Sequence, residues 1–143
     1  QCALEHADYV AAKGGHIVWY NDEHSGDYGA HALSYPAALA ETLARLGPNA
    51  FFSFDVDAIR AADMPAVSCP SPVGLSAADA LAMCRRAGEC AAVRLVDVSE
   101  LSPTAVSKGE AYRSAKLVAC MFYRFALGRA LAHARTNSKG ACA

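Results

Sequence analysis

The stretch Ala50-Phe51-Phe52-Ser53-Phe54-Asp55-Val56-Asp57 decides the fold, because an apolar run ends there in two acids. The run from Ala50 to Phe54 predicts a strand buried on both faces, as in a parallel sheet that is covered by helices. Side chains alternate along a strand, so we expect Asp55 and Asp57 to point the same way. They stand at the carboxyl end of the strand, where open α/β sheets bind their ligands.

Two carboxylates on one side of a strand end form half of a site for a hard divalent cation. The alternative is that these acids open a loop or cap the next helix, which is the usual role of an Asp-x-Asp sequence. The stretch alone leaves both interpretations open.

Strand and helix patterns alternate along the chain and predict an α/β fold with a parallel sheet. Ser76 is expected to cap one helix, with Asp79 completing a capping-box arrangement. An apolar stripe predicts the buried side of the last helix, and it is formed by Val118, Met121, Phe122 and Phe125. Helices are expected at residues 4–12, 35–46, 77–87 and 109–134, and strands at 16–20, 50–54 and 93–98.

Two further stretches follow the Asp-x-Asp strand. Met64 to Ser76 is a Pro-rich loop that closes in Gly-Leu-Ser, and Leu95 to Pro103 is a strand end that reads Asp-x-x-Glu-x-x-Pro. In this order the three stretches resemble the ureohydrolase family, which contains arginase, agmatinase and formimidoylglutamase. The spacing from Asp57 to Cys69 and on to Glu100 is free of gaps against the family pattern. The resemblance extends over most of the chain from the Asp-x-Asp strand onward.

The resemblance implies a three-layer α/β/α arrangement around a parallel sheet, the arginase-like fold, with two Mn2+ ions in each intact active site. It assigns Asp55 to the carboxylate that bridges the two ions and Asp57 to a ligand of one of them. Glu100 matches the residue that pairs with the cationic guanidinium or amidinium end of the substrate, a role that suits a carboxylate. Cys69 falls where arginases keep a small polar residue beside the substrate carbon, so we expect it to line the pocket. A surface acid and a plain buried cysteine are the alternatives, and no residue of this chain is assigned as a catalytic acid or base.

Two departures from the arginase pattern resemble the formimidoylglutamase branch. The strand is followed by Asp57-Ala58-Ile59-Arg60 rather than Asp-x-x-Asp-Pro, and the loop reads Val67-Ser68-Cys69-Pro70 rather than Gly-Thr-Pro. This branch hydrolyses N-formimidoyl-L-glutamate to L-glutamate and formamide in histidine degradation, where Arg60 could hold the acidic substrate. The alternatives are an arginase, an agmatinase, or a non-catalytic fragment or interaction module of the same fold.

Composition excludes several other classes of protein. The chain has 143 residues, 54% of them hydrophobic, and a formal net charge of −1. Its basic residues are scattered and form no stripe with aromatic residues, which predicts no nucleic-acid partner. No apolar run approaches the roughly 20 residues that a membrane span needs. The cysteines have no zinc-site spacing, which is typical of reduced thiols in the cytoplasm; they are Cys2, Cys69, Cys84, Cys90, Cys120 and Cys142.

The family pattern also places a metal-binding His and an Asp-x-His-x-Asp motif well before the Asp-x-Asp strand, and the preceding residues here contain no such motif. We therefore expect residues 1–143 to be the C-terminal portion of a single ureohydrolase domain, with the N-terminal half as a tight partner at the exposed sheet edge. The resemblance further implies a homo-oligomer and a small-molecule amidine substrate. Acids and histidines also gather in Asn21–His31, but their spacing fits neither a zinc helix nor a calcium loop, and a solvated connection is the better interpretation.

Overall fold

A computed structural model describes residues 4–15, 17 and 35–140, in two compact units of residues 1–33 and 34–143. In the first unit, α1 spans Leu4–Ala12, with the predicted bounds. The chain leaves this helix through Gly14, whose φ of 72° is a left-handed conformation that glycine adopts without a steric penalty. All but Ile17 of the strand expected at 16–20 lies outside the described residues, as does the segment Asn21–His31.

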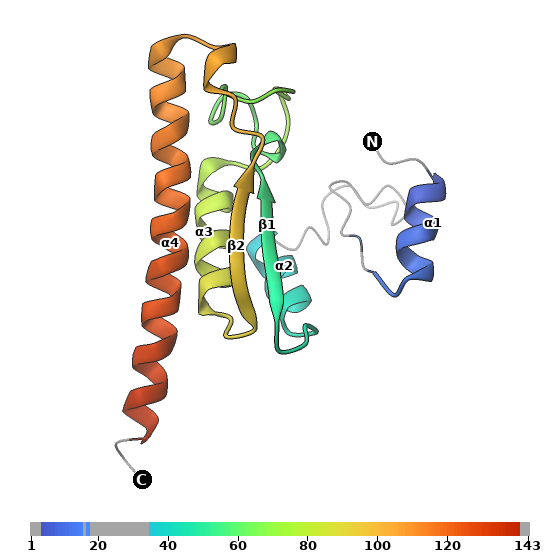
Figure 1. The fold of residues 1–143 in the computed structure, drawn as a ribbon, viewed down its shortest axis with the longest axis vertical. Coiled ribbons are helices and arrows are strands. Elements are labelled where there is room, and N and C mark those ends of the chain that lie inside the picture. The colour runs from blue at the N-terminus through green and yellow to red at the C-terminus, as the bar shows by residue number, and fades with distance from the viewer. Residues whose placement is uncertain (1–3, 16, 18–34, 141–143) are drawn as a thin grey trace. The chain divides into compact units, whose positions relative to one another are not determined.

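The second unit is a helix followed by a β-α-β segment and a long final helix (Figure 1). A 3-10 turn follows each strand, and the loop of residues 59–76 separates the first of these turns from the next helix. The elements are α2 (Tyr35–Leu43), β1 (Ala50–Asp55), η2 (Val56–Ala58), α3 (Ala77–Glu89), β2 (Val93–Ser99), η3 (Pro103–Ala105) and α4 (Lys108–Gly140).

The strands β1 and β2 pair in parallel, and α3 forms the crossover between them. Phe52 lies opposite Val96 and Asp55 lies opposite Ser99 in the register. The carboxyl ends of both strands therefore meet at one edge of the sheet, beside the loop that precedes α3 (Figure 1).

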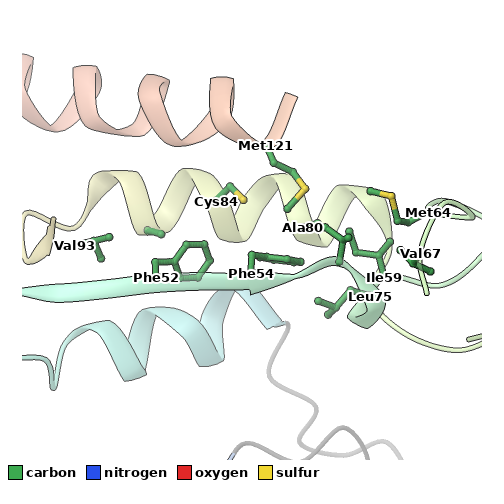
Figure 2. Close-up of a cluster of buried hydrophobic side chains, with 12 residues drawn as sticks. Phe52, Phe54, Ile59, Met64, Val67, Leu75, Ala80, Cys84, Val93 and Met121 are labelled. Atoms are coloured by element: carbon green, nitrogen blue, oxygen red, sulfur yellow. The ribbon is translucent and has the colours of Figure 1, made fainter. Parts of the chain in front are cut away.

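The expectation that β1 is buried on both faces is wrong for the described part of the chain. Phe52 and Phe54 are buried and point toward α3 (Figure 2). On the other face Phe51 is 58% exposed, and Leu95, its partner in β2, is 62% exposed. Within the second unit, the helices cover one face of the strand pair and leave the other uncovered, so burial alternates along β1.

The helix α3 begins where the sequence predicts. The Ser76 hydroxyl accepts a hydrogen bond from the Asp79 backbone N–H, and the Asp79 carboxylate accepts one from the Ser76 backbone N–H. This capping box satisfies N–H groups that have no partner within the helix, which fixes the start of α3. The helix buries Ala80, Cys84 and Ala87 against the strands and α4.

The final helix α4 is longer than predicted at both ends, but its predicted stripe is largely confirmed. Met121 is fully buried, while Val118 and Phe125 are partly buried against the core. Phe122 is 43% exposed, so the stripe is narrower than expected. None of the helices in the described part of the chain combines the length and the apolar character needed to cross a bilayer.

Two glycines allow the backbones of α3 and α4 to approach each other closely. A Cβ at Gly88 in α3 would overlap the carbonyl oxygen of Phe125 in α4, and a Cβ at Gly128 in α4 would overlap the carbonyl oxygen of Arg85 in α3. Glycine inside a helix costs about 1 kcal/mol relative to alanine. Close packing of the two helices offsets this cost.

We expect Gly88→Ala to lower the free energy of unfolding by about 1–3 kcal/mol, because the two helices would have to separate. Gly109→Ala is the control, since Gly109 lies at the start of α4, the helix that packs against α3, and a Cβ there has nothing within 4 Å. It should leave stability unchanged or slightly higher. Urea denaturation followed by circular dichroism measures both variants, and an equal loss in the two would contradict this account of the helix contact.

Candidate metal and substrate site

The strand β1 ends at Asp55, and the chain then turns into η2 instead of continuing as a strand. The prediction that Asp55 and Asp57 share one side of a strand is therefore wrong, because Asp57 lies in the turn. The Asp57 backbone N–H donates to Oδ1 of Asp55 at 2.8 Å. Asp55 thus caps the turn with one carboxylate oxygen, and its second oxygen remains able to accept another bond or bind a cation.

The carboxylates of Asp57 and Glu100 lie on either side of one serine hydroxyl. The Ser68 Oγ is 3.1 Å from Oδ2 of Asp57 and 3.0 Å from Oε2 of Glu100. The other oxygen of Asp57, Oδ1, is buried and has no hydrogen-bond partner in the described part of the chain. Buried polar atoms are nearly always paired, so this oxygen is suited to a ligand such as a cation.

Glu100 follows β2 directly, as expected, and has a φ of 67°. It is the only non-glycine residue with positive φ in the described ranges. Such a conformation costs about 1–2 kcal/mol for a residue with a Cβ. Strain of this kind concentrates at binding and catalytic sites, where the surrounding structure holds it in place.

The loop between η2 and α3 is held at both of its sides. Val67 and Leu101 form an antiparallel bridge, and the Ser102 N–H donates to the carbonyl of Ala66 at 2.8 Å. The Ala66 N–H donates to the Oγ of Ser114, which is fully buried in α4. These bonds fix the backbone that directly precedes Ser68 relative to the end of β2 and to α4.

Asp63 fixes the other side of the loop to α3. Its Oδ2 accepts from the Ala77 N–H at 2.9 Å and from Nε of Arg60 at 2.8 Å. The hydrogen bond from the Ala77 N–H is the main cause that holds the pKa of Asp63 below its usual value; burial opposes it, and the hydrogen bond and charge of Arg60 lower the pKa further. Arg60 is therefore paired with Asp63 within the loop, and among the described residues it has no contact with Glu100.

Cys69 follows Ser68 and is an exposed, free thiol. This disagrees with a plain buried cysteine and leaves Cys69 beside the serine that links the two acids. Asp97, on β2 opposite Ser53, has a buried Oδ1 without a partner among the described residues. The other described cysteines, Cys84, Cys90 and Cys120, are also free thiols.

Four expected site residues thus lie around one end of the strand pair: Asp55, Asp57, Cys69 and Glu100. Ser68 was missed by sequence reasoning, because its contacts span 11 and 32 residues along the chain and no periodic pattern signals them. Over the residues that the structure describes, no group of three or more His, Cys, Asp or Glu side chains could enclose a metal ion. The carboxylates fit a hard cation by chemistry, but by themselves they form only part of a metal site.

Comparison with known proteins identifies similar sequences and folds. A profile of the Arginase family matches residues 5–127. Formiminoglutamase from Trypanosoma cruzi, solved with Mn2+, is 44% identical over 90% of this chain, with a TM-score of 0.73. An oxidised form of formiminoglutamase from the same organism, solved at pH 4.6, is 43% identical over 89% of this chain, with a TM-score of 0.72.

Arginase from Bacillus cereus shares the fold at a TM-score of 0.68, with 18% identity over 86% of this chain. The chain spans 39% of the length of the manganese-bound formiminoglutamase, and 40% of both its oxidised form and the arginase. A search of curated proteins finds no match. The observed parallel sheet and its helices are therefore a part of the three-layer arginase-like fold.

The strain at Glu100 leads to a test of stability. We expect Glu100→Gly to raise the free energy of unfolding by about 1 kcal/mol, because glycine adopts the left-handed conformation without the Cβ penalty. Glu100→Ala removes the same carboxylate but keeps the Cβ, and it serves as the control. Chemical denaturation should show the glycine variant as the more stable of the two, and equal stability would mean that the conformation carries no strain.

The lowered pKa of Asp63 predicts a pH dependence. A carboxyl group with a lower pKa in the folded state stabilises the protein above its unfolded pKa, near 3.8, and loses that effect as the pH falls through the folded value. Asp63→Asn should therefore be less stable than the parent at neutral pH. The gap in the free energy of unfolding between the two proteins should close as the pH falls through the pKa that Asp63 has in the folded state. Denaturation curves at several pH values measure the gap, and a gap that stays constant into acid would contradict the assignment.

Proposed function

The chain belongs to the arginase family, and we propose that it supplies part of a manganese-dependent hydrolase site that cleaves C–N bonds in linear amidines. The observation that supports this most directly is the arrangement of Asp57 and Glu100 on either side of Ser68, at the carboxyl ends of paired parallel strands. Asp55 is the last residue of β1 and lies two residues before Asp57.

Under this proposal Asp55 and Asp57 hold the metal through the oxygens that their local hydrogen bonds leave open. Those oxygens are Oδ2 of Asp55, since its Oδ1 caps the turn, and Oδ1 of Asp57. Bound manganese supplies the Lewis acidity that makes water nucleophilic near neutral pH. The hard oxygen donors of the two carboxylates suit Mn2+, and the remaining ligands come from outside the described residues.

Glu100 is proposed to bind the cationic end of the substrate. A planar amidinium group offers parallel N–H donors, which a carboxylate accepts in charge-assisted hydrogen bonds. Glu100 is exposed and directly follows β2 in a strained backbone conformation, so its carboxylate is accessible at the end of the strand pair. The exposed Cys69 next to Ser68 would line the same pocket.

The proposed substrate is N-formimidoyl-L-glutamate, which gives L-glutamate and formamide. Support comes from the identity of 44% to a formiminoglutamase, against 18% to an arginase. Arginine and agmatine are the alternative substrates. We also propose that the protein acts in the cytoplasm and in histidine breakdown, a proposal supported by the proposed substrate and by the free thiols of the described cysteines. A homo-oligomer is likewise proposed from the family.

The N-terminal part of the family's fold is proposed to complete the site. Phe51 and Leu95 are exposed on a face of the strand pair that no helix of the second unit covers, and a second helical layer would cover this face. Mass spectrometry of the denatured natural protein tests this. It should find a longer chain, or a second polypeptide, that carries an Asp-x-His-x-Asp motif, and a species limited to the present sequence would contradict it.

We expect Asp57→Asn in the complete protein to lower Mn2+ affinity and hydrolysis of N-formimidoyl-L-glutamate by at least about 100-fold, because a neutral amide is a poor ligand for a hard cation. Asp8→Asn, which removes an exposed acid on α1, is the control and should change neither. Assays with N-formimidoyl-L-glutamate, arginine and agmatine, together with metal analysis, provide the readout. A parent protein without manganese and without activity on all three would leave the non-catalytic interpretation of this fold.

A further inference from the structure

Ser68 connects three segments that are distant in sequence. Its hydroxyl lies 3.1 Å from Oδ2 of Asp57 in the turn after β1, and 3.0 Å from Oε2 of Glu100 after β2. No feature of the family resemblance assigns a role to this serine. Its side chain is exposed and contributes nothing to the buried core, so packing does not explain its position.

The loop that carries Ser68 is bonded to the segment that follows β2. The residue before it, Val67, is 2% exposed and bridges to Leu101, which follows Glu100 directly. The carbonyl of Ala66 accepts from the Ser102 N–H at 2.8 Å. The backbone bonds of Ala66 and Val67 to the residues after Glu100 thus hold the backbone before Ser68 next to Glu100.

The two carboxylates need a group between them. Like charges repel, and Glu100 is an exposed side chain that could turn into solvent. A serine hydroxyl has one hydrogen to donate, so it bonds one carboxylate at a time while remaining close to the other. If a cation binds one of the two carboxylates, the Ser68 hydroxyl hydrogen is free to bond the other carboxylate.

We propose that Ser68 is a positioning residue for the amidine-hydrolase site. Its hydroxyl donates to Oδ2 of Asp57 in the metal-free site, and it donates to Oε2 of Glu100 once a cation lies on the buried, unpartnered Oδ1 of Asp57, so that it holds Glu100 at the place where the substrate cation binds. The inference rests on the proposed function, because it assigns Asp57 to the metal and Glu100 to the substrate. What is new is the role of the Ser68 hydroxyl, which sets the positions of both carboxylates.

The test compares three variants of the complete protein. Ser68→Ala removes the hydroxyl, Ser68→Thr keeps it, and Ser71→Ala is the matched control in the same loop, where the hydroxyl accepts only from the Val73 N–H at 3.3 Å. Mn2+ affinity is measured by electron paramagnetic resonance of the free ion. The values of kcat and KM are measured in an assay with N-formimidoyl-L-glutamate as substrate. Thermal unfolding is recorded for each variant. Ser68→Cys, which keeps the shape but donates weakly, replaces the alanine variant if the latter does not fold.

We expect Ser68→Ala to weaken Mn2+ binding by about 10- to 100-fold and to raise KM by a similar factor, as loss of a residue that orients a ligand does. Ser68→Thr should restore both values, and Ser71→Ala should change neither. The unfolding temperature of the metal-free proteins should stay the same throughout, since the hydroxyl is exposed. Parent-like Mn2+ affinity and KM in Ser68→Ala would overturn the proposal.

A parent protein that neither binds Mn2+ nor hydrolyses the substrate would refute the proposed function, and crystal structures then decide the role of Ser68 separately. The carboxylates of Asp57 and Glu100 should keep their separation in Ser71→Ala and lose it in Ser68→Ala. Unchanged carboxylate positions in Ser68→Ala would overturn the positioning role.

Discussion

Parallel pairing of β1 with β2 is the constraint on which the candidate site depends. The register places Asp55 opposite Ser99, so Glu100 follows directly after the partner of the first acid. A shift by one residue would turn the side chains of a strand to the opposite face and move Glu100 away from Asp57. Burial sets this register, because Phe52 and Phe54 must face α3 to be removed from water.

Close contact between α3 and α4 supports this arrangement from outside the sheet. The two glycines at their crossing let α4 lie against α3, and Met121 reaches the cluster that contains Phe54 and Ala80 (Figure 2). The same helix supplies the buried Ser114 hydroxyl that accepts from the Ala66 N–H. Helix packing therefore also fixes the loop that contains Ser68.

Local patterns in the sequence predicted much of this structure, and long-range contacts account for what they missed. Apolar runs and caps gave α1, β1 and the start of α3, and the family resemblance gave Asp57, Cys69 and Glu100 at one end of the sheet. The exposed Phe51 was missed because a strand cannot show which of its faces is covered. The turn at Asp57 and the bridging Ser68 depend on side chains that meet only after folding, so no local period signals them.

The central claim is that the acids at this strand end hold manganese in the complete protein. Anomalous X-ray diffraction at the manganese edge, on crystals of the complete protein grown with Mn2+, tests it most directly. The account predicts anomalous density in contact with the carboxylates of Asp55 and Asp57, with Glu100 oriented toward the adjoining space. Density that lies elsewhere, or its absence beside these two carboxylates in manganese-saturated crystals, would contradict the account.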